Sequence, residues 1–180
     1  PRESFYLATK YPGHQLASSY DPAAIFEEQL KKCGVEYFDF YLLHNLGEDR
    51  IQKAEDVHAW EYLVQKKAEG KIKRLGFSYH GTPELLEQIL DKHPETEFVQ
   101  IQLNYADWDN AIVHSGRLYE ILRERNMPII IMEPVKGGTL AVVPERVRTL
   151  FASMHPDWSV ASWAIRFAAT QKNVFMVLSG

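Results

Sequence analysis

Short apolar runs alternate with segments of helical spacing along the whole chain of 180 residues. The runs are rich in β-branched and aromatic residues and are bounded by Gly, Pro or polar clusters, which is typical of buried strands. Neither face of these strands is polar, so both faces must be covered by other elements. The alternation therefore predicts an α/β fold with a parallel sheet and helices against it. The six predicted strands cover 5–9, 38–43, 74–78, 98–103, 129–133 and 174–178.

Five helices are predicted between these strands. The first begins at the Asp21-Pro22 pair, which supplies a cap and a first turn, and ends at Gly34. The other four are predicted from apolar residues three or four positions apart. Their stripes are Val57, Trp60 and Val64, with an end at Gly70; Leu86, Ile89 and Leu90; Leu118, Ile121 and Leu122; and Val160, Trp163, Ala164 and Phe167.

A (β/α)8 or TIM barrel explains this order better than a doubly wound sheet. No G-x-G-x-x-G motif opens a helix, and polar residues gather just after the strands, where such a barrel has its active site. However, only six strand-helix units are present, and the chain is shorter than the roughly 250 residues typical of the fold. We therefore predict one domain over residues 1–180 that forms an incomplete barrel.

Composition limits the partners and the compartment. The net charge of −4 comes from mixed charges, so no basic surface is predicted for nucleic acid or for anionic membranes. No apolar stretch approaches the roughly 18 residues of a membrane span, and the first residues do not resemble a signal peptide but look like an internal cut. The single Cys33 excludes an internal disulfide and is typical of a reducing cytoplasm. We expect this thiol in the core near a helix end, and we expect no metal site.

Two basic side chains follow the first two predicted strands. Counting with period two places Lys10 on the face of Tyr6 and Ala8, and His44 on the face of Phe38, Phe40 and Leu42. If both faces line the barrel, an ammonium and an imidazole point into one apolar mouth, where desolvation disfavours a charged lysine. The alternative is structural: a histidine at a strand end is often simply hydrogen bonded, and a lysine there often reaches solvent.

Other polar residues receive simpler interpretations. Asp39 has the opposite parity to His44, so we expect a local hydrogen bond near the start of its strand. The remaining histidines show no metal-ligand spacing and are predicted at the surface: His14, His58, His93, His114 and His155. Met127 and the tryptophans Trp60 and Trp163 are predicted in the core.

The segment Glu133-Pro134-Val135-Lys136-Gly137-Gly138 follows the fifth predicted strand. A glycine pair lets backbone amides approach an anion, and a neighbouring lysine adds positive charge, so the segment is a candidate phosphate site. An ordinary Gly-Gly turn with an exposed lysine is an equally good interpretation.

With these residues in place, the chain resembles the aldo-keto reductases. The matching pieces are FYLATKY at 5–11, YFDFYLLHN at 37–45, GKIKRLGFSYHG at 70–81, VQIQLNYADWDN at 99–110 and PIIIMEPVKGGTLA at 128–141. They occur in family order over essentially the whole chain. The variants FSYHG, NYADWDN and MEPVKGG are most similar to the bacterial and archaeal branch that often carries a ferredoxin-like iron–sulfur tail, which this chain lacks.

The resemblance implies a (β/α)8 barrel that moves a hydride between a nicotinamide cofactor and a small carbonyl or alcohol substrate. The cofactor is usually NADPH, with NADH as the alternative. Lys10 matches the family lysine that lowers the pKa of a proton-donating tyrosine, and His44 matches the histidine that orients the carbonyl oxygen. The family aspartate and tyrosine have no match in this chain, so we expect it to be inactive or nearly so.

The same resemblance implies the cofactor-binding residues. Ser78 and Gln102 match residues that hold the nicotinamide carboxamide, and Tyr79 stands where many members have asparagine. Met132 replaces the tyrosine on which the nicotinamide commonly stacks, which makes a softer platform. The remaining candidates run beside the pyrophosphate: Glu133, Val135, Lys136, Gly137 and Gly138.

Counted in family order, the six strands are the third to the eighth. An incomplete barrel exposes sheet edges, so we expect a fragment, a truncated gene product or a chain whose other portions lie outside this sequence. Completion of the barrel by another chain or by a swapped copy of this chain is a further hypothesis. Two other functions stay open: a Schiff-base lyase that uses Lys10, and a non-catalytic nucleotide-binding or regulatory barrel.

Overall fold

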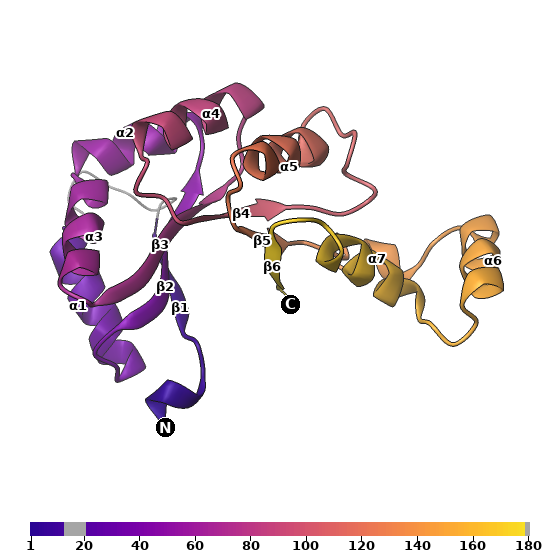
Figure 1. The fold of residues 1–180 in the computed structure, drawn as a ribbon, viewed down its shortest axis with the longest axis horizontal. Coiled ribbons are helices and arrows are strands. Elements are labelled where there is room, and N and C mark those ends of the chain that lie inside the picture. Colours follow the sequence, from indigo (N-terminus) through magenta and orange to yellow (C-terminus); the bar gives the residue numbers. More distant parts are fainter. Residues whose placement is uncertain (13–20, 179–180) are drawn as a thin grey trace. The chain divides into compact units, whose positions relative to one another are not determined.

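The computed structural model describes residues 1–12 and 21–178, and it is an α/β structure (Figure 1). The strands are β1 Ala8–Tyr11, β2 Phe38–Leu46, β3 Ile72–Tyr79, β4 Phe98–Gln102, β5 Ile129–Met132 and β6 Val174–Val177. They follow chain order in one six-stranded sheet, and the pairs β1–β2, β2–β3 and β5–β6 are parallel. The predicted α/β class and parallel sheet are therefore confirmed. His14 lies outside the described residues.

The chain divides into two compact units, Pro1–Val99 and Gln100–Gly180, and each is described here by itself. The first unit contains β1 to β3 and the helices α1 Pro22–Cys33, α2 Glu48–Asp56, α3 Ala59–Ala68 and α4 Pro83–Lys92. A short 3-10 helix, η1 Arg2–Ser4, precedes β1. The core of the first unit is aromatic and aliphatic. The ring of Phe26 in α1 packs against the rings of Phe38 and Tyr41 on β2, and the ring centroids are 5.8 and 5.2 Å from that of Phe26.

Local signals in the sequence explain where these helices begin and end. The Asp21 carboxylate accepts a hydrogen bond from the Ala23 N–H, with Pro22 as the first helical residue of α1. The helix ends at Gly34, whose φ of 63° is left-handed and suits glycine. At α4, the Thr82 hydroxyl oxygen accepts from the Leu85 N–H before Pro83. The predicted start of α1 at the Asp21-Pro22 pair is confirmed.

Gly76 on β3 is required by a close approach. A Cβ atom at this position would lie 2.3 Å from the backbone oxygen of Phe98 and 2.8 Å from its ring. No side chain fits in that space, so glycine lets Phe98 pack directly on the backbone of β3.

The second unit contains β5, β6 and the helices α5 Ser115–Glu124, α6 Glu145–Met154 and α7 Val160–Ala169. A short 3-10 helix, η3 Thr139–Ala141, follows the Gly137–Gly138 turn. The side chains of Leu118, Ile121 and Leu122 are buried on one face of α5, as their spacing predicts. The Ser159 hydroxyl caps α7 by accepting from the Ser162 N–H.

The structure corrects several expectations. The first strand begins at Ala8 and not at Phe5, because Phe5 and Tyr6 are 51 and 79 % exposed. Two further helices, α2 and α6, were not predicted, because α2 is largely charged and no residue of α6 is buried. Cys33 lies at a helix end, as expected, but it is exposed because it lies on the solvent side of the last turn of α1.

The aromatic and histidine predictions are also partly corrected. Trp60 is buried as predicted, but Trp163 and Met127 are only half-buried. His93, expected at the surface, is buried and stacks on Trp60 with ring centroids 4.0 Å apart. The Asp39 prediction is confirmed: its carboxylate accepts hydrogen bonds from the Leu7 N–H at 2.8 Å and from Arg2 at 2.6 Å.

Candidate functional site

Lys10 and His44 lie at the ends of neighbouring strands in the first unit. Lys10 pairs in register with Leu42, which precedes His44 by two residues and so shares its face of β2. Both Lys10 and His44 are half-buried, and β1 and β2 run parallel, so their ends meet at one edge of the sheet. Partial burial lowers the pKa of the Lys10 ammonium, in the direction expected from desolvation.

Ser78 and Tyr79 lie at the end of β3, and the side chain of each is hydrogen bonded to the backbone of the protein. The Ser78 hydroxyl is buried and accepts a hydrogen bond of 2.8 Å from the Asn45 N–H, where β2 turns with a φ of 56°. Ser78 therefore ties the ends of β2 and β3 together beside His44. The Tyr79 hydroxyl donates to the Thr82 carbonyl at 2.6 Å, and burial raises the pKa of this phenol. Tyr79 thus supports the turn that leads into α4.

The second unit holds a polar network after β4 and β5. The fully buried Asp107 carboxylate accepts hydrogen bonds from the side-chain amides of Gln102 and Asn104, at 2.8 and 2.9 Å. Its other oxygen forms an ion pair with the Lys136 ammonium. The Asn104 amide also donates to the Glu133 carbonyl at 3.1 Å. Burial alone raises the pKa of Asp107, but these donors outweigh it and lower the pKa below the ordinary value.

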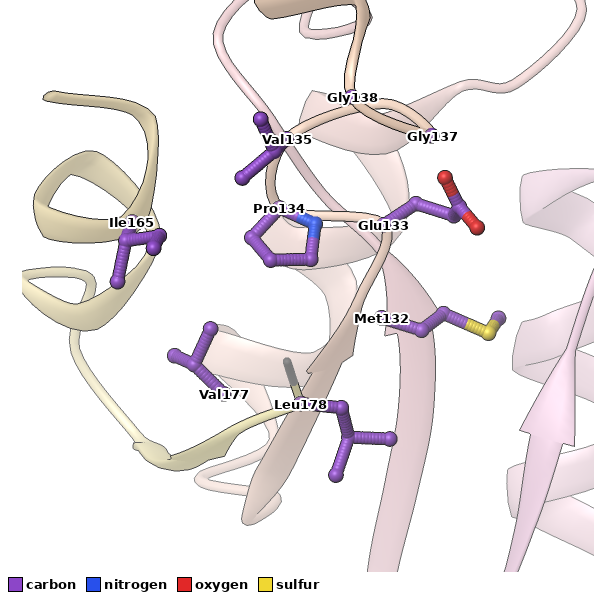
Figure 2. A pocket seen from close by; sticks show the side chains of 9 residues that line it. All are labelled: Met132, Glu133, Pro134, Val135, Gly137, Gly138, Ile165, Val177 and Leu178. Atoms are coloured by element: carbon purple, nitrogen blue, oxygen red, sulfur yellow. The ribbon is translucent and has the colours of Figure 1, made fainter. Parts of the chain in front are cut away.

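A cavity of about 800 Å³ lies beside this network (Figure 2). The Met132–Val135 chain and the Gly137–Gly138 turn line one side, and Ile165 of α7 with Val177 and Leu178 lines the other. In Figure 2 the side chains of Met132 and Glu133 project away from Ile165 and Val177. The lining is largely apolar, with Glu133 as its charged side chain.

The Gly137–Gly138 turn presents backbone amides to solvent. Lys136, Gly137 and Gly138 have successive φ angles of 52, 58 and 89°, and both glycines are exposed. Among the described residues, no group accepts a backbone hydrogen bond from the N–H of Gly137 or of Gly138. Consecutive amides of this kind form a concave site for an anion, so the backbone fits the phosphate interpretation of the segment.

Gln100 is a candidate that the sequence analysis did not identify. Its side-chain amide lies 3.1 Å from the Met132 sulfur, whereas the amide of Gln102 is directed to Asp107. Gln100 and Gln102 share one face of β4, so the alternation that selected Gln102 also indicates Gln100. Their contacts distinguish the two, since Gln100 meets Met132 and Gln102 meets Asp107.

The described parts of the chain also limit other kinds of site. Within residues 1–12 and 21–178, no group of three His, Cys, Asp or Glu side chains is arranged to hold a metal ion. None of the helices in the same residues is long and apolar enough to cross a membrane.

The family model of the aldo/keto reductases matches residues 1–180, so the chain belongs to this family. An aldehyde reductase of Saccharomyces cerevisiae is 24 % identical over 196 aligned residues, which cover 92 % of this chain and 59 % of the relative. An uncharacterised oxidoreductase of Schizosaccharomyces pombe is 30 % identical over 94 residues, or 52 % of this chain and 31 % of that protein. The chain thus spans well under two thirds of these relatives.

Solved structures of the family share the fold. The aldo/keto reductase of Brucella melitensis superposes with a TM-score of 0.75 at 21 % identity, over 100 % of this chain and 64 % of that one. The enzyme of Klebsiella pneumoniae, solved in complex with NADP and acetate, gives 0.73 at 20 % identity over 99 and 61 %. These similarities support the barrel-type architecture that the strand order predicts.

Proposed function

We propose that this chain is part of an NADPH-dependent oxidoreductase of the aldo-keto reductase type that acts on small aldehydes, ketones or alcohols. The observation that carries the proposal is the position of Lys10 and His44 at the ends of the neighbouring parallel strands β1 and β2, in a chain that belongs to this family. The reductase of Klebsiella pneumoniae, whose structure contains NADP, supports the choice of cofactor. When bound, the dinucleotide supplies the hydride.

The first unit would contribute the polar groups nearest the reacting carbonyl. His44 would donate a hydrogen bond to the carbonyl oxygen, and Lys10 would lower the pKa of the tyrosine that protonates it. The 180 residues contain no match for that tyrosine or for its aspartate partner. We therefore expect a protein of these residues alone to bind dinucleotide but to turn over slowly, if at all.

The second unit would hold the cofactor. Met132 would form the apolar platform, and the exposed amides of Gly137 and Gly138 would donate to the pyrophosphate. Val135 and Lys136 would flank it, and Glu133 would stand at the edge of the cavity, where its negative charge does not favour a phosphate. Gln102, together with Gln100, is proposed for the carboxamide. Ser78 and Tyr79 stay candidates for cofactor binding because of the family resemblance alone.

A binding assay with a matched control tests the proposal. The protein is titrated with NADPH and with NADH while the fluorescence of the reduced nicotinamide is followed. We expect binding, and we expect Gly138→Val to weaken it strongly, because φ is 89° there and the strained side chain would displace an amide that we propose as a ligand of the pyrophosphate. Gly34→Val alters another left-handed glycine, which is not among the candidate residues, and should leave the affinity unchanged. A protein that binds neither nucleotide is not a reductase of this type.

Two alternatives have specific support. The lowered pKa of Lys10 favours an amine nucleophile, so a Schiff-base lyase is tested by borohydride trapping of an aldehyde on Lys10. A non-catalytic nucleotide-binding barrel is supported by the Gly137–Gly138 turn, whose backbone fits a phosphate, and is tested by tight NADPH binding without oxidation by any aldehyde.

We also propose that the protein is cytoplasmic. For its assembly, we propose that a second chain or a swapped copy of this chain completes the barrel. The support is that the chain covers 61 to 64 % of the superposed structures. Light scattering decides this point: a compact monomer that binds NADPH would contradict completion by another chain.

A further inference from the structure

The segment Glu133–Gly138 is linked to the buried Asp107 carboxylate by an ion pair and by hydrogen bonds through Asn104. Asp107 is 0 % exposed, and it is the acceptor for Gln102, Asn104 and Lys136. Asn104 in turn reaches the Glu133 carbonyl. The network therefore connects the end of β4 to both ends of the turn that precedes Gly137.

We propose that Asp107 is a positioning residue for the dinucleotide site, and that Lys136 serves as the tether of the Gly137–Gly138 turn rather than as a direct ligand of phosphate. This inference rests on the proposed function, because it assigns roles within the same cofactor site. It predicts that the anion is bound by backbone amides, whose directions the Lys136–Asp107 ion pair sets.

Burial explains why the lysine stays on the carboxylate. The Asp107 side chain is 0 % exposed, whereas the Lys136 side chain is 39 % exposed. If the ammonium moved to a bound phosphate, a buried carboxylate would lose its charged partner, which is costly. Two amide donors would remain, but neither neutralises the charge. The ammonium therefore gains less from the phosphate than it loses at Asp107.

The backbone of the turn explains why a tether is needed. Glu133 and Lys136 have positive φ angles of 57 and 52°, which are unfavourable for residues with side chains. The contacts of Asn104 with Glu133 and of Asp107 with Lys136 hold these two residues, and the glycines follow directly. Without the tethers, the turn would relax and the two amides would lose their present orientation.

The two roles of Lys136 predict opposite effects of Asp107→Asn. The new amide can keep its oxygen toward Gln102 and Asn104, but it then turns its NH₂ group toward Lys136, so the ammonium is released. If Lys136 tethers the turn, Asp107→Asn weakens NADPH binding about tenfold, as expected for the loss of a charge-assisted hydrogen bond. If Lys136 is a phosphate ligand, the same variant binds NADPH equally well or more tightly.

The experiment is a double-mutant cycle on NADPH affinity, with folding of every variant checked by circular dichroism. We expect Asp107→Asn and Lys136→Met to weaken binding about equally, and the double variant to be no weaker than either single variant. Lys136→Arg should recover most of the affinity lost in Lys136→Met, because a guanidinium also pairs with a carboxylate. Lys172→Met, an exposed lysine of the same unit, is the control for charge.

The outcomes separate the inference from the proposed function. Additive losses, or unchanged affinity in folded Asp107→Asn, would overturn the tether while leaving the reductase proposal intact. A marked drop in the salt dependence of binding in Lys136→Met, absent in Lys172→Met, would identify a direct phosphate contact and also overturn it. If the unmodified protein binds no NADPH, the proposed function fails, and the inference fails with it.

Discussion

At the residue scale, three carboxylates with little or partial exposure organise the two units. Asp39 accepts from Arg2 and from the Leu7 backbone, Glu97 accepts from Arg74 and the Leu75 backbone, and Asp107 accepts from Gln102, Asn104 and Lys136. In each case burial raises the pKa of the carboxyl group, but the donors outweigh burial and lower it. These acids therefore connect neighbouring segments of the chain through hydrogen bonds. The sequence analysis predicted such a hydrogen bond only for Asp39.

The Asp39 connection leads to the first prediction. Asp39→Asn should lower the free energy of unfolding by about 2 kcal/mol, because the half-buried Arg2 loses its charged acceptor. Urea unfolding at pH 7 measures the change. Glu28→Gln is the matched control, since the Glu28 and Lys32 side chains are 61 and 69 % exposed, and its effect should be under about 0.5 kcal/mol. Equal effects of the two variants would show that burial does not matter at Asp39.

Elements follow from local sequence where an apolar stripe or a cap is present. The capped helices α1, α4 and α7 follow from Asp21, Thr82 and Ser159, and all six strands lie close to their predicted positions. The misses have physical reasons. Helix α2 has no apolar stripe from which it could be predicted. The apolar Phe5 lies outside β1, and the Arg2 guanidinium carbon lies 5.2 Å from the centroid of its ring.

Gly76 provides the prediction at the element scale. Gly76→Ala should destabilise the first unit by about 3 kcal/mol, because the new Cβ atom would overlap the Phe98 backbone. Gly34→Ala should cost about 1 kcal/mol, since only the left-handed φ of 63° is unfavourable and no atom lies within 4 Å. Urea unfolding of both variants measures the difference. A larger loss at Gly34 would contradict the close approach of Phe98 to β3.

At the scale of the whole molecule, the lowered carboxyl pKa values predict acid sensitivity. A carboxyl group with a lower pKa in the folded state stabilises the protein above the unfolded pKa of about 4, and this contribution is lost as the pH falls through the folded value. The free energy of unfolding should therefore decrease below about pH 4. Asp39→Asn/Glu97→Gln/Asp107→Asn should flatten this dependence, measured as urea midpoints at pH 7 and pH 3.5.

The control for acid sensitivity uses exposed acids. Glu28→Gln/Glu145→Gln removes two carboxylates whose side chains are 61 and 72 % exposed, and it should keep the pH dependence of the unmodified protein. If both sets of substitutions flatten the curve equally, general charge and not the hydrogen-bonded carboxylates Asp39, Glu97 and Asp107 causes the acid sensitivity.

The sequence by itself determined the order of strands and helices, the capping residues and the family, because these depend on local pattern and on short motifs. Only the tertiary structure decided that Cys33 faces solvent, that His93 packs on Trp60 and that Gln100 meets Met132. The Lys136–Asp107 ion pair is also visible only in the tertiary structure. It joins residues 29 positions apart, and no local pattern shows which buried acid will neutralise a given lysine.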